Sequence, residues 1–219
     1  MSGPDVLCEL QREVEELHGS EGTPDVRAFV VDDSTRRLLP GARADIPEQL
    51  FVRQDPGDPQ ELELALYIAP RIVASLAHDD PHERLHAGNL DDYWIALEGV
   101  SHFVMVATRA VGQRKVTALE LEIQAEVDKF AAAWHLLRAQ GMSPERAAQQ
   151  LMRRLFGPYA LHEPMPREEA DRYHVATRVA RRFCAELARC YGHDAQPTRV
   201  EHAVRRFVRL ELAEKLRAA

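Results

Sequence analysis

The sequence contains little lysine, and it has no long apolar run. Only three lysines accompany 25 arginines among the 219 residues. Together with frequent alanine, this preference is typical of a protein encoded by a GC-rich bacterial genome. No apolar run approaches the roughly 20 residues that cross a bilayer. The sequence therefore predicts no membrane partner.

Cysteine is also scarce. The three cysteines are odd in number, and no C-x-x-C pair is present. Cys184 and Cys190 lie six residues apart on one predicted helix, so they point to different faces and should not form a bridge. The acidic N-terminal segment lacks the apolar centre of a secretion signal. These features predict a reducing, cytoplasmic location.

The net charge of −7 conceals an asymmetry along the chain. Residues 141–219 carry 15 basic and 10 acidic side chains, whereas residues 1–140 carry 13 basic and 25 acidic ones. We favour the interpretation that the acidic and basic parts attract each other, or that the charges of each part are simply solvated. The alternative is a basic surface for nucleic acid. No nucleic-acid-binding motif supports that alternative, so we do not favour it.

The N-terminal third alternates between helical and extended patterns. Apolar residues at 6, 10, 14 and 17 form one stripe and predict a helix over 4–18. Segments 27–32, 49–53 and 61–68 are predicted strands, and the sequence QDPGDP at 54–59 predicts a turn before the last of them. Three such strands form a small antiparallel β-meander with one face covered by a helix.

Residues from Pro70 onward have helical periodicity. Predicted helices cover 71–77, 81–87, 90–111, 118–140, 144–156 and 167–191. A last helix, capped by Thr198 with Glu201, runs close to the C-terminus. Asn89 and Thr117 are predicted caps, and Gly192 is a predicted stop. The expected fold is α+β and mainly α: residues 1–70 form a helix and a small sheet, and residues 71–219 form a multi-helix bundle packed with it. The predicted core comprises Val100, Val104, Leu119, Ile123, Val127, Phe130 and Trp134.

Two of the predicted helices carry ionisable residues within or beside their apolar faces. Glu98 and His102 lie four residues apart on one helix, and Glu122 and Glu126 lie four apart on the next. Buried groups of this kind must be paired, altered in pKa or bound to a ligand. They could form a general base or a divalent metal site. We favour the other interpretation, in which they form a buried polar network or an interface to another chain.

A second group of histidines lies just upstream. His82, Glu83 and His86 match the pattern H-E-x-x-H, in which two histidines bind zinc and the glutamate acts as a base; His78 precedes them. The predicted helix at 81–87 has only two turns, and the expected third-ligand segment is missing. Glu83 is also the predicted capping partner of Asp80. These points disfavour a catalytic zinc site.

The sequence carries no strong catalytic signature. It has no phosphate-binding glycine loop, no G-x-S-x-G elbow and no dinucleotide fingerprint. We therefore predict a non-catalytic bacterial adaptor or accessory subunit that binds another protein and needs no cofactor; assembly with copies of itself is compatible with this prediction. One alternative is a divalent-metal-dependent hydrolase that uses the histidine and glutamate groups. Another is nucleic-acid binding by the basic C-terminal helices.

Overall fold

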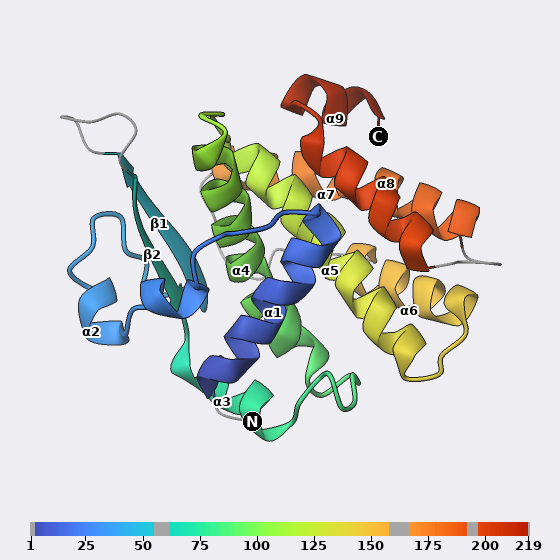
Figure 1. Ribbon diagram of the computed structural model, residues 1–219, viewed down its shortest axis with the longest axis horizontal. Coiled ribbons are helices and arrows are strands. Elements are labelled where there is room, and N and C mark those ends of the chain that lie inside the picture. Colours follow the sequence, from blue (N-terminus) through green and yellow to red (C-terminus); the bar gives the residue numbers. More distant parts are fainter. Residues whose placement is uncertain (1–2, 55–61, 158–166, 192–196, 219) are drawn as a thin grey trace. The chain divides into compact units, whose positions relative to one another are not determined.

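The computed structural model describes residues 3–54, 62–157, 167–191 and 197–218 (Figure 1). It has two compact units: the first comprises Met1–Glu16 and Ser20–Val116, and the second comprises Leu17–Gly19 and Thr117–Ala219. The boundary suggested near residue 70 lies inside the first unit. Residues 55–59 of the predicted turn and the predicted stop at Gly192 lie outside the described residues. Among those described, no helix is both long and apolar enough to cross a bilayer.

The first unit contains a two-stranded sheet packed on one helix. Strand β1 (Glu48–Gln54) pairs antiparallel with β2 (Leu62–Ile68), so that Glu48 lies opposite Ile68. Helix α4 (Leu90–Val111) packs against both strands. A β-carbon at Gly99 would lie 2.9 Å from Glu48 Oε2 and 3.1 Å from Leu66 Cδ1. The missing side chain therefore allows α4 to approach the sheet closely, and the prediction of a helix-covered sheet is confirmed.

The strand predicted at 27–32 was wrong. Val26–Phe29 forms a short 3-10 helix, η1, and Asp33–Arg36 forms α2; only Val30 makes an isolated parallel bridge, to Leu66. Two aspartates explain the difference, because the Asp25 side chain accepts a hydrogen bond from Arg27 N and Asp32 accepts one from Thr35 N. Such local bonds compete with an extended ladder. The described sheet therefore has two strands instead of three.

Two further helices complete the first unit, and both were predicted. Helix α1 spans Gly3–His18, and its apolar stripe is buried. Helix α3 spans Pro70–His78 and begins with a proline, which suits the first turn because that position needs no donor. The last residues of α1, Leu17 and His18, belong to the second unit. The turn region that connects α3 to α4 carries the site described below.

The second unit is helical. Its elements are α5 (Ala118–Ala139), α6 (Pro144–Phe156), α7 (Arg167–Tyr191), α8 (Pro197–Arg209) and α9 (Leu212–Ala218). Helix α5 packs against α6, α7 and α8. It begins with the predicted capping box: Thr117 Oγ1 accepts from Glu120 N, and Glu120 Oε2 accepts from Thr117 N. The predicted core residues of α5 are buried, except that Leu119 is only half-buried.

The end of the chain differs from the prediction. Helix α8 begins at Pro197, so Thr198 lies inside its first turn rather than at the cap. The last predicted helix is also interrupted, because the chain bends at Leu210 and restarts as α9. Glu214 Oε2 accepts from Glu211 N at 2.9 Å and supports this new start. The break between α8 and α9 thus coincides with a side-chain hydrogen bond at the start of α9. The apolar periodicity of the sequence gives no sign of such a bond.

A buried polar network crosses the second unit. Asp128 on α5 is fully buried, and its two carboxylate oxygens lie 2.8 Å from His18 Nε2 and 2.8 Å from Gln124 Nε2. Lys215 on α9 is also fully buried and donates to Gln124 Oε1 at 3.0 Å. Its ammonium lies 5.0 Å from the centre of the Phe207 ring. The Gln124 amide thus links a buried carboxylate to a buried ammonium.

The three cysteines are unpaired in the structure. Cys184 is buried in the second unit, and its pKa lies well above the usual value, first because of burial and then because of nearby Glu126 and Asp128. Its thiol therefore stays protonated and unreactive at neutral pH.

Replacement of Asp128 by alanine should strongly destabilise the second unit. It leaves buried His18 without its carboxylate partner and breaks the link through Gln124 to buried Lys215. Stranding a buried charge costs about 3–5 kcal/mol. The free energy of unfolding from urea titration is the measurement. The matched control is Glu186→Ala, which removes the exposed partner of Arg189 and should cause no detectable change. If the two substitutions lowered the free energy of unfolding equally, the buried network would contribute no more to stability than an exposed ion pair, and the prediction would be wrong.

Candidate functional site

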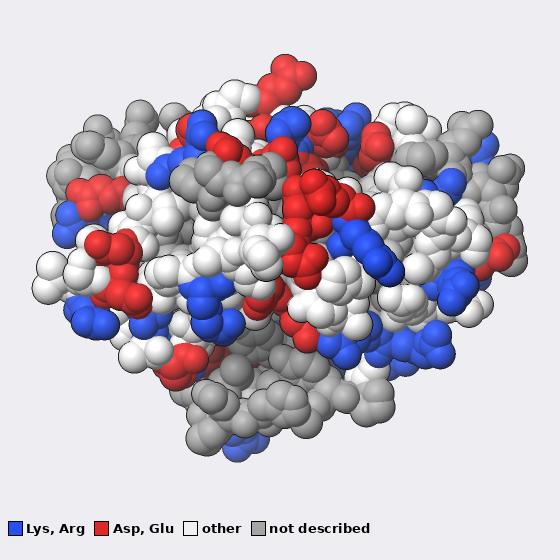
Figure 2. Space-filling view, turned by 90° about the horizontal axis from the view of Figure 1, so that it is seen from below, with Lys and Arg blue, Asp and Glu red and all other residues white. Residues whose placement is uncertain are grey.

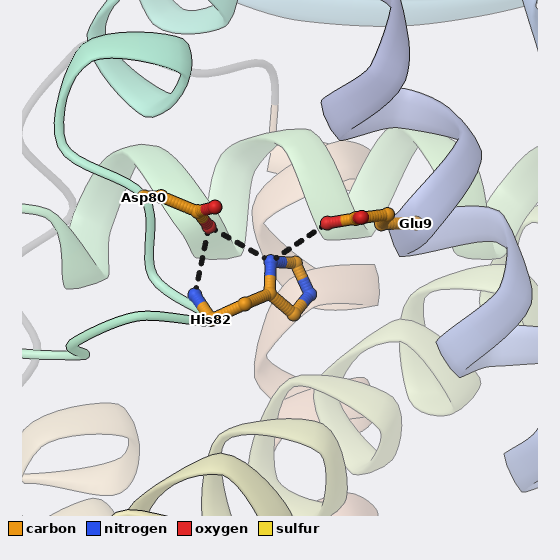
Figure 3. A group of neighbouring side chains, drawn as sticks. All are labelled: Glu9, Asp80 and His82. Atoms are coloured by element: carbon orange, nitrogen blue, oxygen red, sulfur yellow. Dashed lines mark hydrogen bonds and ion pairs between the residues drawn. The ribbon is translucent and has the colours of Figure 1, made fainter. Parts of the chain in front are cut away.

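The best-defined cluster of ionisable side chains lies in the first unit. Glu9 and Glu13 are one turn apart on α1, and Asp80 and His82 lie in the turn region after α3. Figure 3 shows the carboxylates of Glu9 and Asp80 converging on the His82 ring. Apolar residues on the other side of α1, among them Leu10, are buried and fix the rotation of the helix. We call Glu9, Glu13, Asp80 and His82 the His82 cluster.

Both ring nitrogens of His82 face carboxylates. Nδ1 lies 3.0 Å from Asp80 Oδ1 and 3.3 Å from Glu9 Oε2, and Nε2 lies 3.0 Å from Glu13 Oε1. The second oxygen of Glu13 accepts a hydrogen bond of 2.9 Å from the hydroxyl of Tyr93, which is fully buried. An imidazolium can donate from both nitrogens at once, so this arrangement favours the protonated ring.

The electrostatics of the cluster follow from these contacts. Partial burial lowers the pKa of His82, but hydrogen bonds and charge attraction from Glu13 and Asp80 outweigh it and raise the pKa to about 9. The pKa of Tyr93 lies well above its usual value, because burial and the Glu13 carboxylate both oppose the phenolate. His82 is therefore charged at neutral pH, and Tyr93 remains a donor.

The helix predicted over 81–87 is wrong. His86 N donates to Asn89 Oδ1 at 2.9 Å, and Asn89 Nδ2 donates to Arg84 O at 2.9 Å. Gly88 N donates to His86 Nδ1 at 3.0 Å. Each bond ties up a backbone group that a continuous helix would use, so side chains replace the helical ladder. Asn89 precedes α4, as predicted, but its side chain supports this turn region and makes no cap bond.

The residues of the H-E-x-x-H pattern have different partners. His82 approaches Glu9, Glu13 and Asp80, whereas His86 Nε2 lies 3.2 Å from Asp79 Oδ1. Among the described residues, the group of potential ligand atoms around His82 contains Glu9 and Asp80. Glu83 and His78 are exposed. Without the helix, nothing places the two histidines on one face as a zinc-dependent hydrolase of this pattern requires.

The remaining candidate residues are divided between the units. Glu98 and His102 lie on α4 in the first unit, where His102 is buried and Glu98 is half-buried. Glu122 and Glu126 lie on α5 in the second unit. Glu122 Oε1 is 3.8 Å from Arg172 Nε, and Glu126 Oε1 accepts from Lys129 Nζ at 2.8 Å. The two glutamates thus have basic neighbours within their unit. A site that combines all four residues stays a prediction.

A small hollow opens beside the His82 cluster. Its volume is about 220 Å³, and its lining consists of Glu9, Arg12, Glu13, Glu16 and His82. The hollow leaves room for a small ion with its water. Chemically, the arrangement can hold a proton or exchange it for another cation.

Sequence reasoning identified His82 but missed its acidic partners. Glu9, Glu13 and Glu16 form a helical stripe on the polar face of α1, and this spacing was the available signal. Their approach to His82 was not visible, because Glu13 and His82 are 69 positions apart in the chain. No family model, curated protein or solved structure matches this chain.

His82 should make the stability of the first unit depend on pH. Its pKa in the folded state, about 9, exceeds the reference value of 6.5. Its stabilising contribution is therefore complete below pH 6.5 and is lost as the pH rises through about 9. The difference in unfolding free energy between the natural protein and His82→Gln should shrink across that interval in urea titrations at several pH values. A difference that stays constant from pH 6 to 9.5 would contradict the assignment.

Proposed function

We propose that this chain is a non-catalytic adaptor or accessory subunit that binds an acidic segment of another protein. The observation that carries the proposal is an arginine-lined hollow in the first unit, of about 590 Å³. We call it the arginine hollow. Its lining comes from α2 and the residue after it, from the segment 44–47, from the end of β2 and from the start of α3: Asp33, Arg36, Arg37, Ala44, Asp45, Ile46, Pro47, Tyr67, Ala69, Pro70 and Arg71.

Side-chain contacts hold the wall of the arginine hollow together. The Arg36 guanidinium stacks 3.9 Å from the centre of the Tyr67 ring and donates to Ile46 O at 3.2 Å. Arg36 is only 5% exposed, although it is charged. The Tyr67 hydroxyl donates to Asp33 Oδ1 at 2.8 Å. These contacts fix a cationic, aromatic surface before any partner arrives, and such preorganisation lowers the entropic cost of binding.

Exposed groups at the rim of the arginine hollow can reach a partner. Arg37 and Arg71 are exposed, and Arg71 lies 3.7 Å from Asp92. Among the described residues, Arg37 forms no ion pair. Leu38, next to Arg37, is 84% exposed. An arginine beside an exposed leucine suits a segment with both acidic and apolar side chains, which is more typical of a protein than of a nucleic acid.

Nucleic-acid binding is the second candidate. A hollow of about 480 Å³ on α8 is lined by Arg199, His202, Ala203 and Arg206. The lining of this hollow contains two arginines, and on the one face drawn in Figure 2 acidic side chains lie among the basic ones. Binding to a polyphosphate backbone relies on an extended basic field. The observations therefore favour the protein partner.

Reversal of the two rim charges should weaken binding of an acidic peptide. The probe is a fluorescent peptide of alternating glutamate and leucine, and fluorescence anisotropy gives its dissociation constant. Arg37→Glu/Arg71→Glu replaces two exposed attractions by repulsions, so we expect a loss of about tenfold or more. Because exposed charges are screened, the affinity of the natural protein should fall with added salt.

Arg199→Glu/Arg206→Glu is the matched control, because it makes the same charge change on α8. It should leave peptide affinity nearly unchanged. If it weakens binding as much as the rim variant, the peptide responds only to net charge and the arginine hollow is not the site. Tight, salt-dependent binding of a DNA oligonucleotide that only the α8 variant abolishes would support the nucleic-acid alternative instead.

A further inference from the structure

We propose that the His82 cluster is a binding site for one divalent transition-metal ion, with Glu9 Oε2, Asp80 Oδ1 and His82 Nδ1 as ligands. The ion would replace the proton on Nδ1 and hold α1 against the turn region after α3. This role is structural and is independent of the arginine hollow. The residues come from two segments of the first unit that are about 70 positions apart in the chain.

The two distances from His82 to its acidic neighbours match those between ligands of one ion. Nδ1 of His82 is 3.0 Å from Asp80 Oδ1 and 3.3 Å from Glu9 Oε2, and all three atoms lie within 4.8 Å of one another (Figure 3). Ligands about 2.0–2.2 Å from one ion are roughly 3.0–3.5 Å apart in octahedral or tetrahedral geometry. Both distances to His82 Nδ1 therefore match an ion shared with Asp80 and Glu9.

The surroundings of His82 match those of a metal ligand. A ligating histidine usually donates its other ring N–H to a carboxylate, which fixes the orientation of the ring. Here Nε2 lies 3.0 Å from Glu13 Oε1, and buried Tyr93 donates to the other oxygen of Glu13. The carboxylate behind the histidine is thus itself held in place. This support is independent of the two acidic ligands and distinguishes the cluster from a chance group of surface acids.

The donor set selects the class of ion. One imidazole nitrogen with two carboxylate oxygens suits Zn²⁺, Co²⁺ or Mn²⁺ better than Mg²⁺ or Ca²⁺, which prefer oxygen ligands alone. The adjacent hollow leaves room for water at the remaining positions. Arg12 also lines the hollow, but it approaches the other oxygen of Glu9, Oε1, at 3.9 Å and is mostly exposed. It can therefore turn away when an ion binds.

Titration of the tag-free, chelator-treated full chain with Co²⁺ tests the proposal. Visible absorption reports the coordination of Co²⁺, and calorimetry with Zn²⁺ gives the stoichiometry. We expect one ion per chain at the tightest site, and its loss in His82→Gln. Glu9→Gln, a change on a partly exposed side chain, should weaken binding even if the His82 variant is unstable. Glu13→Gln should keep the stoichiometry and weaken binding by roughly 10–100-fold, because it removes the support of the ring.

His86→Gln is the matched control, because His86 also lies beside an aspartate, Asp79. Among the described residues, however, His86 belongs to no group of three potential ligands. It should bind the ion as the natural protein does. The proposal is overturned if the natural protein shows neither a change in Co²⁺ absorption nor calorimetric binding of Zn²⁺ at saturating ion concentration. It is equally overturned if Glu9→Gln and His82→Gln bind normally, or if the His86 variant alone loses the ion.

Discussion

The buried carboxylate of Asp128 constrains how the helices of the second unit can pack. A charge with no access to water is tolerated only when hydrogen bonds and an opposite charge compensate it. His18, Gln124 and Lys215 provide that compensation, and two of them lie far from Asp128 in the chain. The helices that carry these residues must therefore keep their places for the network to form. Apolar packing alone would allow more than one arrangement of similar helices, and a polar network of this kind restricts the choice.

The first unit solves a related problem near its surface. His82 and its three carboxylates are only partly buried, so water and ions can reach them. The same pairing that would be purely structural in a core can here respond to protons or to a metal ion. The arginine hollow follows this pattern too, because Arg36 is fixed by Tyr67 and by backbone carbonyls while its neighbours remain exposed. The His82 cluster and the arginine hollow thus share one feature: a charged side chain held by neighbouring groups lies next to charged side chains that solvent can reach.

Side-chain bonds to the backbone account for the main errors of sequence reasoning. Asp25 and Asp32 turn a segment of strand-like composition into short helical turns. Asn89 and His86 similarly divert backbone groups from the helix expected over 81–87. In each case the apolar pattern was compatible with the predicted element. A few polar side chains prevented these elements from forming, because a local hydrogen bond offers the backbone an alternative to regular structure.

The sequence alone determined the elements with strong periodicity: the apolar stripe of α1, the alternation of β2, the capping box of α5 and the long helices α4 to α7. These signals act between residues up to four positions apart, so they can be read along the chain. The tertiary structure alone decided which polar groups meet. His18 and Asp128 are 110 positions apart, Gln124 and Lys215 are 91 apart, and Glu13 and His82 are 69 apart. No local pattern encodes such a meeting, because it depends on how the apolar faces of whole helices pack.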